Sequence, residues 1–376
     1  MPPAPLVGCF ATMVAMGLLI SALGPLLPVI RGEFQIGPQL AGFLVAGNPL
    51  GCIAGTLLSM LLSHRIAARW LLVGTGLTLA LGLLGAALAP AWWLLFAAFV
   101  VMGIGYGAGT NLVNGVVAVA YGSRAAGVLN LMNGVFGVGA VVGPFVVSLV
   151  GGSRLAYLPY VLVALLAAVL MWRLPSSYAT AASPEPDARR VAPRPAWGRL
   201  AATAAMLGAY TATEVSASSF ATTHVLATGV SVDAAVRATA MFYIGLAAGR
   251  LLVSPVASRI GSGRLMLICA ALASGCLVLA WVAPLGGLTY VLVGAAMGPV
   301  FPTVLAWVSE QAFGRNALPV VLTAANVGGL ILPPLIGTVI AAVGAAAAPL
   351  PMAVSVGLSA VLIAVVTSAR GRVANT

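Results

Sequence analysis

One acidic residue, Glu214, stands near the middle of a long stretch of otherwise apolar or small residues, 199–227. The whole chain of 376 residues has only six acidic residues. A charged group near the middle of a bilayer costs about 2.5–3.5 kcal/mol on insertion scales, so such a group is retained where it faces a partner or a cavity. A carboxylate in this position can bind a solute, take part in proton transfer, or fix a neighbouring helix through an ion pair.

Arg250 is the partner that the sequence offers to Glu214. It lies inside the next apolar stretch, residues 233–259, at a depth similar to that of Glu214. In one interpretation the two charges form a buried ion pair, and removing one of them would cost about 3–5 kcal/mol. In the other, Glu214 faces a central cavity and takes part in solute or proton binding. The two interpretations are compatible.

Hydroxyl groups surround the acid. Thr211 and Ser218 lie three residues before and four residues after Glu214, so the three side chains share one helix face. We expect this face to line the cavity, while most neighbouring serines and threonines serve helix packing. His224, near the outer end of the same stretch, is expected to be an interfacial group.

The first half of the chain carries amides instead of acids. They occur in pairs three residues apart, so each pair shares one face of a predicted helix, and the members are Asn111 with Asn114 and Asn130 with Asn133. Asn48 and Asn326 add single amides in two other apolar stretches. Because an amide both donates and accepts, these groups suit a polyhydroxylated solute. The alternative for any one of them is a hydrogen bond between helices.

Composition defines the elements that must position these groups. The chain is 61% hydrophobic and 6% charged, with a mean hydropathy of +1.12, whereas an ordinary soluble domain is roughly 25% charged. A spanning helix needs about 20 apolar residues. The sequence predicts twelve such helices, at residues 6–30, 37–62, 71–89, 92–120, 124–150, 154–174, 199–227, 233–259, 264–283, 286–311, 316–343 and 348–369.

Charge and composition predict the orientation and the division of the chain. All 17 basic residues are arginines, and most fall on loops or helix ends of one side, which the positive-inside rule makes the cytoplasm. The predicted location is the inner (plasma) membrane with both termini cytoplasmic, and nucleic acid is not an expected partner. A segment rich in proline and charge, 175–198, reads as a cytoplasmic linker between six-helix bundles at 1–174 and 199–376.

The two halves resemble each other. The pair Gly103 and Gly107 recurs as Gly294 and Gly298, at an offset of 191 residues (294 − 103 = 191). Repeated halves are typical of transporters in which the solute binds at the repeat interface and the bundles rock around it. The glycine strings themselves are best explained by close helix packing, because neither follows a strand as a dinucleotide site requires.

Twelve helices in two halves with a polar central linker resemble the major facilitator superfamily over essentially the whole chain. The resemblance implies an all-α membrane fold of two pseudo-symmetric six-helix bundles. It also implies a cytoplasmic latch in the loops after the second and eighth helices. The first copy lacks the acid and both glycines of the family's loop motif, and the second lacks the acid. The residues that stand at matching places are Arg65, Arg69, Arg259, Gly261 and Arg264.

The segments "NLMNGVFGVGAVVGP" and "TEVSASSF", with "GLAAGRLLVSPVASRIG", resemble the fucose–proton symporter group. This implies transport of a small, sugar-like solute with proton symport. The group carries acids in its first and fourth helices, and this chain has none there. Either Glu214 alone provides coupling, or the protein is a facilitator.

The sequence also leaves functions other than transport of a sugar-like solute open. Proton-driven efflux of drugs or amphipathic compounds is the nearest alternative, because Tyr106, Tyr210, Phe220 and Tyr243 could line a cavity. A non-transporting membrane sensor and a membrane-embedded enzyme are more distant, since the chain has one mid-membrane acid and two histidines. We expect no enzymatic activity, no cofactor and no metal, and a monomer whose partners are the solute, the lipid bilayer and protons.

Overall fold

The computed structural model describes residues 1–175, 197–283, 285–310 and 317–373, and throughout these ranges the regular structure is helical. The chain divides into two compact units. Unit 1 contains the helices up to α6, and unit 2 contains α7 to α13 together with residues 37–42. The predicted linker at 175–198 lies outside the described residues except at its ends.

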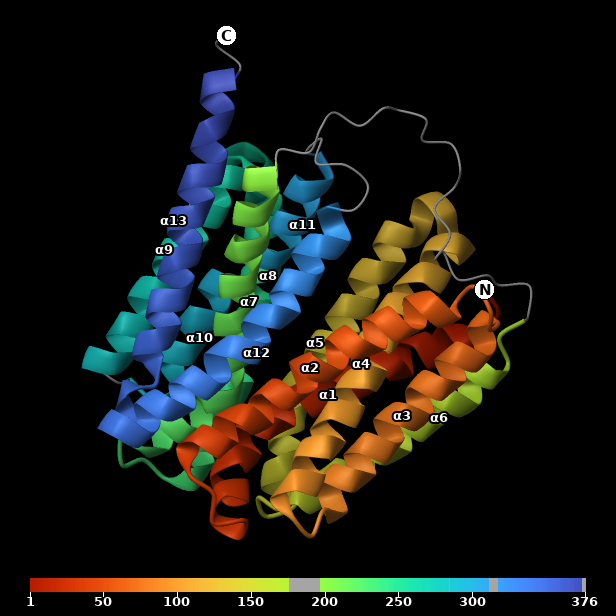
Figure 1. Cartoon of the computed structure of the whole chain (residues 1–376), viewed down its shortest axis with the longest axis horizontal. Coiled ribbons are helices and arrows are strands. Elements are labelled where there is room, and N and C mark those ends of the chain that lie inside the picture. The colour runs from red at the N-terminus through yellow and green to blue at the C-terminus, as the bar shows by residue number, and fades with distance from the viewer. Residues whose placement is uncertain (176–196, 284, 311–316, 374–376) are drawn as a thin grey trace. The chain divides into compact units, whose positions relative to one another are not determined.

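Unit 1 is built from six long helices (Figure 1). They are α1 (Pro3–Glu33), α2 (Pro38–Leu62), α3 (Ala68–Leu88), α4 (Trp92–Tyr121), α5 (Ala125–Leu149) and α6 (Tyr157–Trp172). Short 3-10 turns, η1 (Gly122–Arg124) and η2 (Arg154–Ala156), precede α5 and α6. Within the unit α1 packs on α5 and α6, and α3 packs on α4 and α6.

Unit 2 repeats this arrangement (Figure 1). Its helices are α7 (Trp197–Leu226), α8 (Val232–Ile260), α9 (Ser262–Val282), α10 (Gly287–Met297), α11 (Val300–Glu310), α12 (Ala317–Val343) and α13 (Pro349–Val373), with the turn η3 (Ala345–Ala347) before α13. Here α7 packs on α12 and α13, as α1 packs on α5 and α6. Likewise α9 packs on α13 and α10, as α3 packs on α6 and α4.

Glycines set the closest helix crossings in both units. A Cβ atom on Gly103 of α4 would collide with the carbonyl of Asn48 in α2, and one on Gly107 would collide with the carbonyl of Cys52. In unit 2 the matching Gly294 meets the carbonyl of Phe242 in α8. Helix packing in membranes uses small residues in this way because they let backbones approach. The predicted role of the repeated glycines is therefore confirmed.

One predicted helix is wrong in its continuity. The stretch 286–311 was expected as a single helix, but the structure divides it into α10 and α11 at Gly298 and Pro299. Proline has no backbone N–H, so Pro299 and Pro302 each remove one bond from the i to i−4 ladder. Spacing alone does not divide a helix, because Pro25 and Pro28, which are also three residues apart, lie inside the continuous helix α1.

The described residues contain 11 stretches long and apolar enough to cross a membrane, and α7 is not among them. With 30 residues, α7 is long enough to span. Its serines, its threonines and Glu214 are what lower its hydropathy. A spanning helix of this polarity must turn its polar groups toward protein or water.

Candidate functional site

The predicted site in unit 2 is built on α7. Thr211, Glu214 and Ser218 are all helical, and they occupy the shared face that their spacing predicts. Ser218 is buried and donates its hydroxyl to the Val215 carbonyl at 3.0 Å. Glu214 is half-buried, in contrast to the fully buried residues that follow it along α7.

Glu214 and Arg250 do not form an ion pair. Among the residues that the structure describes, the salt bridge that occurs joins Arg154 to Glu33, in unit 1. The structural interpretation of the Glu214–Arg250 pair is therefore wrong for this conformation. Both charges still act electrostatically on the hydroxyls of Tyr210 and Tyr243, so the four side chains form one neighbourhood inside unit 2.

Arg250 and Tyr210 bind the backbone where α10 ends. The Nε of Arg250 donates to the carbonyl of Gly298 at 3.2 Å. The hydroxyl of Tyr210 donates to the carbonyl of Met297 at 2.8 Å. Sequence reasoning missed both bonds, because neither Met297 nor Gly298 carries a side chain that signals an acceptor.

Several hydroxyls of α7 lie buried without a hydrogen-bond partner. They are Oγ1 of Thr211, Oγ of Ser216 and Oγ1 of Thr223. A serine or threonine in a helix usually returns its proton to a carbonyl of the preceding turn, as Thr213 does toward Ala209 at 3.0 Å. The Thr211 hydroxyl, one turn from Glu214, is therefore an unused hydrogen-bonding group in this conformation.

The amides of α4 and α5 differ in exposure and partners. Asn111 donates its Nδ2 to the Ser59 hydroxyl of α2 at 2.8 Å, which is a hydrogen bond between helices. Asn114, Asn130 and Asn133 are exposed at the surface of unit 1. Asn133 donates to its own Leu129 carbonyl at 2.9 Å. The sequence predicts one group of four amides. In the structure Asn111 bonds to another helix, whereas the other three amides are exposed.

The two single amides are used within their own helices. Asn48 is 6% exposed, and the Cys52 thiol donates to its Oδ1 at 3.5 Å, while its Nδ2 is buried without a partner. Asn326 is half-buried and donates to the Leu322 carbonyl at 3.2 Å. The unmatched Nδ2 of Asn48 is the one of these groups with hydrogen-bonding capacity to spare.

His224 is buried inside unit 2 and is not the interfacial group that the sequence predicts. It is 1% exposed, and its Nδ1 lies 3.2 Å from the hydroxyl of Tyr290 in α10. Beside it, the hydroxyls of Thr222 and Thr239 are 3.0 Å apart. The sequence pattern could not identify Tyr290 because the two helices are separated by more than sixty residues.

The five arginine and glycine residues of the predicted latch lie at helix ends. Arg65 and Arg259 are exposed, and Arg69 places its guanidinium 4.9 Å from the ring centroid of Trp70. Gly261 joins α8 to α9 with φ of 82°, a left-handed conformation that favours glycine. Whether these residues act as a latch stays a prediction.

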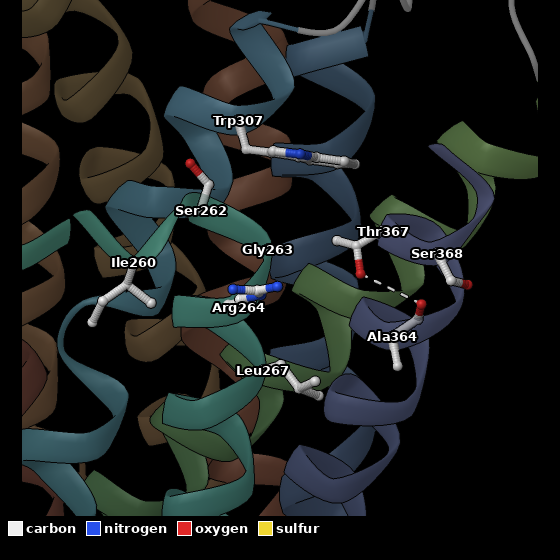
Figure 2. A pocket seen from close by; sticks show the side chains of 10 residues that line it. Ile260, Ser262, Gly263, Arg264, Leu267, Trp307, Ala364, Thr367 and Ser368 are labelled. Carbon is white, nitrogen blue, oxygen red and sulfur yellow. Dashed lines mark hydrogen bonds between the residues drawn. The ribbon is translucent and has the colours of Figure 1, made fainter. Parts of the chain in front are cut away.

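A surface hollow of about 520 Å³ lies beside the second of these loops (Figure 2). Figure 2 shows Gly263 and Arg264, in the first turn of α9, with Trp307, Thr367 and Ser368 around them. The Thr367 hydroxyl is used by its own helix, donating to the Ile363 carbonyl at 2.7 Å. Among the polar groups of the hollow, the Thr367 hydroxyl is thus already used, whereas Arg264 is exposed.

No three of the His, Cys, Asp and Glu residues in the described ranges come together in a way that could hold a metal ion.

Comparison with known proteins places the chain. The family model described as "Major Facilitator Superfamily" matches residues 9–318. No curated protein matches the chain. A crystal structure of the nucleoside transporter NupG (a mutant form) is similar with a TM-score of 0.76 at 17% identity, covering 97% of this chain and 99% of that one.

Two further solved structures give the same fold. A D-xylose–proton symporter has a TM-score of 0.79 at 15% identity, covering 96% of each chain. The transporter FucP in the outward conformation has a TM-score of 0.64 at 16% identity, covering 96% of this chain and 99% of that one. These similarities confirm the predicted all-α fold of two six-helix bundles.

Proposed function

The chain belongs to the major facilitator superfamily, and from that premise we propose that it is a secondary active transporter moving a small, polar, sugar-like solute by alternating access. Glu214 couples this movement to protons. The observation that carries the proposal is a half-buried carboxylate on a membrane helix without an ion-pair partner among the described residues. A permanently neutralised acid could not respond to a proton or a solute.

The groups around Glu214 support a neutral polar solute. Thr211 has an unused hydroxyl, and Tyr243 and Ser218 lie in the same neighbourhood. Hydroxyl and carboxylate groups together can accept and donate to the alternating hydroxyls of a polyol.

The amides of unit 1 support the same class of solute. Asn114, Asn130 and Asn133 are exposed on helices that span the membrane. A polar side chain exposed to lipid is costly, whereas one exposed to a water-filled path can bind a passing solute. We include Asn111 and Asn48 as further solute-binding groups of unit 1, and Asn326 as a solute-binding group of unit 2.

Two of the similar proteins transport chemically related solutes. One is a nucleoside transporter and another is a D-xylose–proton symporter. Nucleosides and xylose are both uncharged and carry several hydroxyl groups. Their chemistry favours an uncharged, hydroxyl-rich solute here over an amphipathic drug, and it favours proton symport over facilitation.

Uptake into proteoliposomes tests the proposal. Radiolabelled pentoses, hexoses and nucleosides are offered with and without an inward proton gradient, and a cationic dye reports the efflux alternative. We expect the intact protein to accumulate one of the neutral solutes above its external concentration only when the gradient is present. Dye extrusion without sugar or nucleoside uptake would favour the efflux function instead.

The Glu214→Gln variant tests the coupling residue. It keeps hydrogen-bonding capacity but cannot ionise, so we expect accumulation to be lost while solute counterflow persists. The matched control is Asp233→Asn, which neutralises an exposed acid at the start of α8 and should accumulate solute normally. Accumulation by Glu214→Gln at the parental level would remove Glu214 from the mechanism.

A further inference from the structure

We propose that Arg250 is a positioning residue, whose hydrogen bond to the Gly298 carbonyl replaces the bond that Pro302 cannot make. This role differs from the ion-pair role that the sequence suggests. The proposal rests on the proposed transport function only in its uptake measurement, because its stability measurement stands alone.

The missing bond follows from helix geometry. In an α-helix the N–H of each residue donates to the carbonyl four residues earlier. Residue 302 would donate to Gly298, but Pro302 has no N–H. The Gly298 residue is itself in a helical conformation, with φ of −48° and ψ of −46°, so its carbonyl points along the helix toward an absent donor. Arg250 Nε fills that place at 3.2 Å.

The neighbouring carbonyls of the same turn are met by α7 and α8 as well. Pro299 removes the donor for the Ala295 carbonyl, and Gly249 of α8 packs directly against that oxygen, where a Cβ atom would collide. Tyr210 of α7 donates to the Met297 carbonyl at 2.8 Å. Two consecutive helices of unit 2, α7 and α8, thus converge on the break between α10 and α11.

The consequence concerns Glu214. Within a membrane a backbone carbonyl must find a donor inside the protein, and a guanidinium provides a strong, charge-assisted one. While Arg250 is held by Gly298, it is not a fixed counter-ion for Glu214. The broken helix therefore gives Arg250 a fixed acceptor other than Glu214, whose carboxylate has Tyr210 as a neighbour.

The test is a rescue experiment on purified full-length protein in detergent, read by its Tm. Arg250→Met keeps the length of the side chain and removes the donor, and we expect the Tm to fall by about 5 °C. Adding Pro302→Ala restores a backbone N–H that can reach the Gly298 carbonyl, so the double variant should regain most of that loss. Pro28→Ala, which restores an N–H inside α1, is the matched control and should not rescue Arg250→Met.

The uptake measurement separates positioning from solute binding. If Arg250 only positions the helix, the Arg250→Met, Pro302→Ala double variant transports with the KM of the intact protein. A recovered Tm with a KM raised tenfold or more would show that Arg250 touches the solute. A Tm that Pro302→Ala leaves unrescued would overturn the proposal whether or not the protein transports sugars.

Discussion

The crossing of α2 with α4 in unit 1 and the crossing of α8 with α10 in unit 2 share a backbone arrangement. In the first, Gly55 and Gly107 bring the helices together, and in the second Gly249 and Gly298 do so. Each of these glycines faces a backbone carbonyl of the other helix so closely that a Cβ atom would collide. The two crossings are therefore one structural device, used twice.

The two crossings differ in the residues around the glycines. At the repeat offset of 191, Pro302 corresponds to Asn111 (302 − 191 = 111), and α4 continues unbroken to Tyr121. In α2 the residue after Gly55 is Thr56, whereas in α8 the residue after Gly249 is Arg250. Unit 1 thus has an intact helix and an amide, whereas unit 2 has a broken helix and the guanidinium that completes it.

The same contrast holds on the first helix of each unit. At the offset of 191, Glu214 corresponds to Leu23 (214 − 191 = 23), which is 5% exposed in α1. The two halves therefore share their helix packing, while two charges near the middle of helices, Glu214 and Arg250, belong to unit 2. The broken helix and an acid without an ion-pair partner among the described residues thus occur in the same unit, as expected if one supports the other.

The strongest way to break the comparison is to move the helix break into unit 1. Asn111→Pro removes the N–H that donates to the Gly107 carbonyl, and α2 has no guanidinium to replace it. We expect this variant to lose about 3 kcal/mol or more of stability. The measurement is thermal unfolding in detergent, followed by size-exclusion chromatography.

The matched change in unit 2 is Pro302→Ala. The alanine N–H can donate to the Gly298 carbonyl, which already accepts a hydrogen bond from Arg250. We therefore expect the stability of this variant to stay within about 1 kcal/mol of the parent. If Asn111→Pro is equally well tolerated, the carbonyl of Gly107 has another donor, and the two crossings differ less than the structure indicates.

Much of this scaffold could be predicted from sequence, because the signals that specify it are local. Runs of about twenty apolar residues give the helices, and a repeated glycine spacing gives the crossings. Spacing alone pairs Gly103 with Gly294. In the structure Gly103 packs against α2 and Gly294 packs against α8, as close helix packing requires. The break at Pro299 was missed because an apolar stretch reads as one helix across prolines.

The contacts of the polar groups could not be predicted in the same way. Arg250 has two acceptors within its neighbourhood, and the sequence shows the carboxylate of Glu214 but not a carbonyl that a proline has freed. Arg154 gives the same lesson. It reads as a loop charge, yet it is 8% exposed and donates to Glu33 at 2.7 Å and to the Ala86 carbonyl at 2.8 Å.

A second prediction sharpens the comparison through the glycines themselves. Gly103→Ala and Gly294→Ala each place a Cβ against backbone, 2.8 Å from the Cα of Gly51 and 2.8 Å from the N of Leu246 respectively. Backbone cannot rotate away as a side chain can, so the helices must separate. We expect each variant to lose about 1–3 kcal/mol in thermal unfolding.

The control is Gly134→Ala in α5, where an added Cβ has no neighbour within 4 Å. Alanine is a better helix former than glycine by about 1 kcal/mol, so this variant should be neutral or more stable. If Gly103→Ala lost stability and Gly294→Ala did not, the helices α8 and α10 would be able to move apart without cost. The glycines of that crossing would then serve movement more than packing.

The smallest expected effect concerns the hydrogen bond that unit 1 uses where unit 2 has the proline. Asn111 donates to Ser59 at 2.8 Å, and hydrogen bonds between membrane helices average about 0.6 kcal/mol in double-mutant cycles. We therefore expect Asn111→Ala and Ser59→Ala to show a coupling energy of that size in thermal unfolding. This effect is smaller than the loss expected for Arg250→Met. The side chains of Asn111 and Ser59 could each find another hydrogen-bond partner, whereas the Gly298 carbonyl has no other donor among the described residues once Arg250 is removed. A coupling energy of zero would show that the hydrogen bond between Asn111 and Ser59 does not stabilise the helix packing, and it would favour a solute-binding role for Asn111.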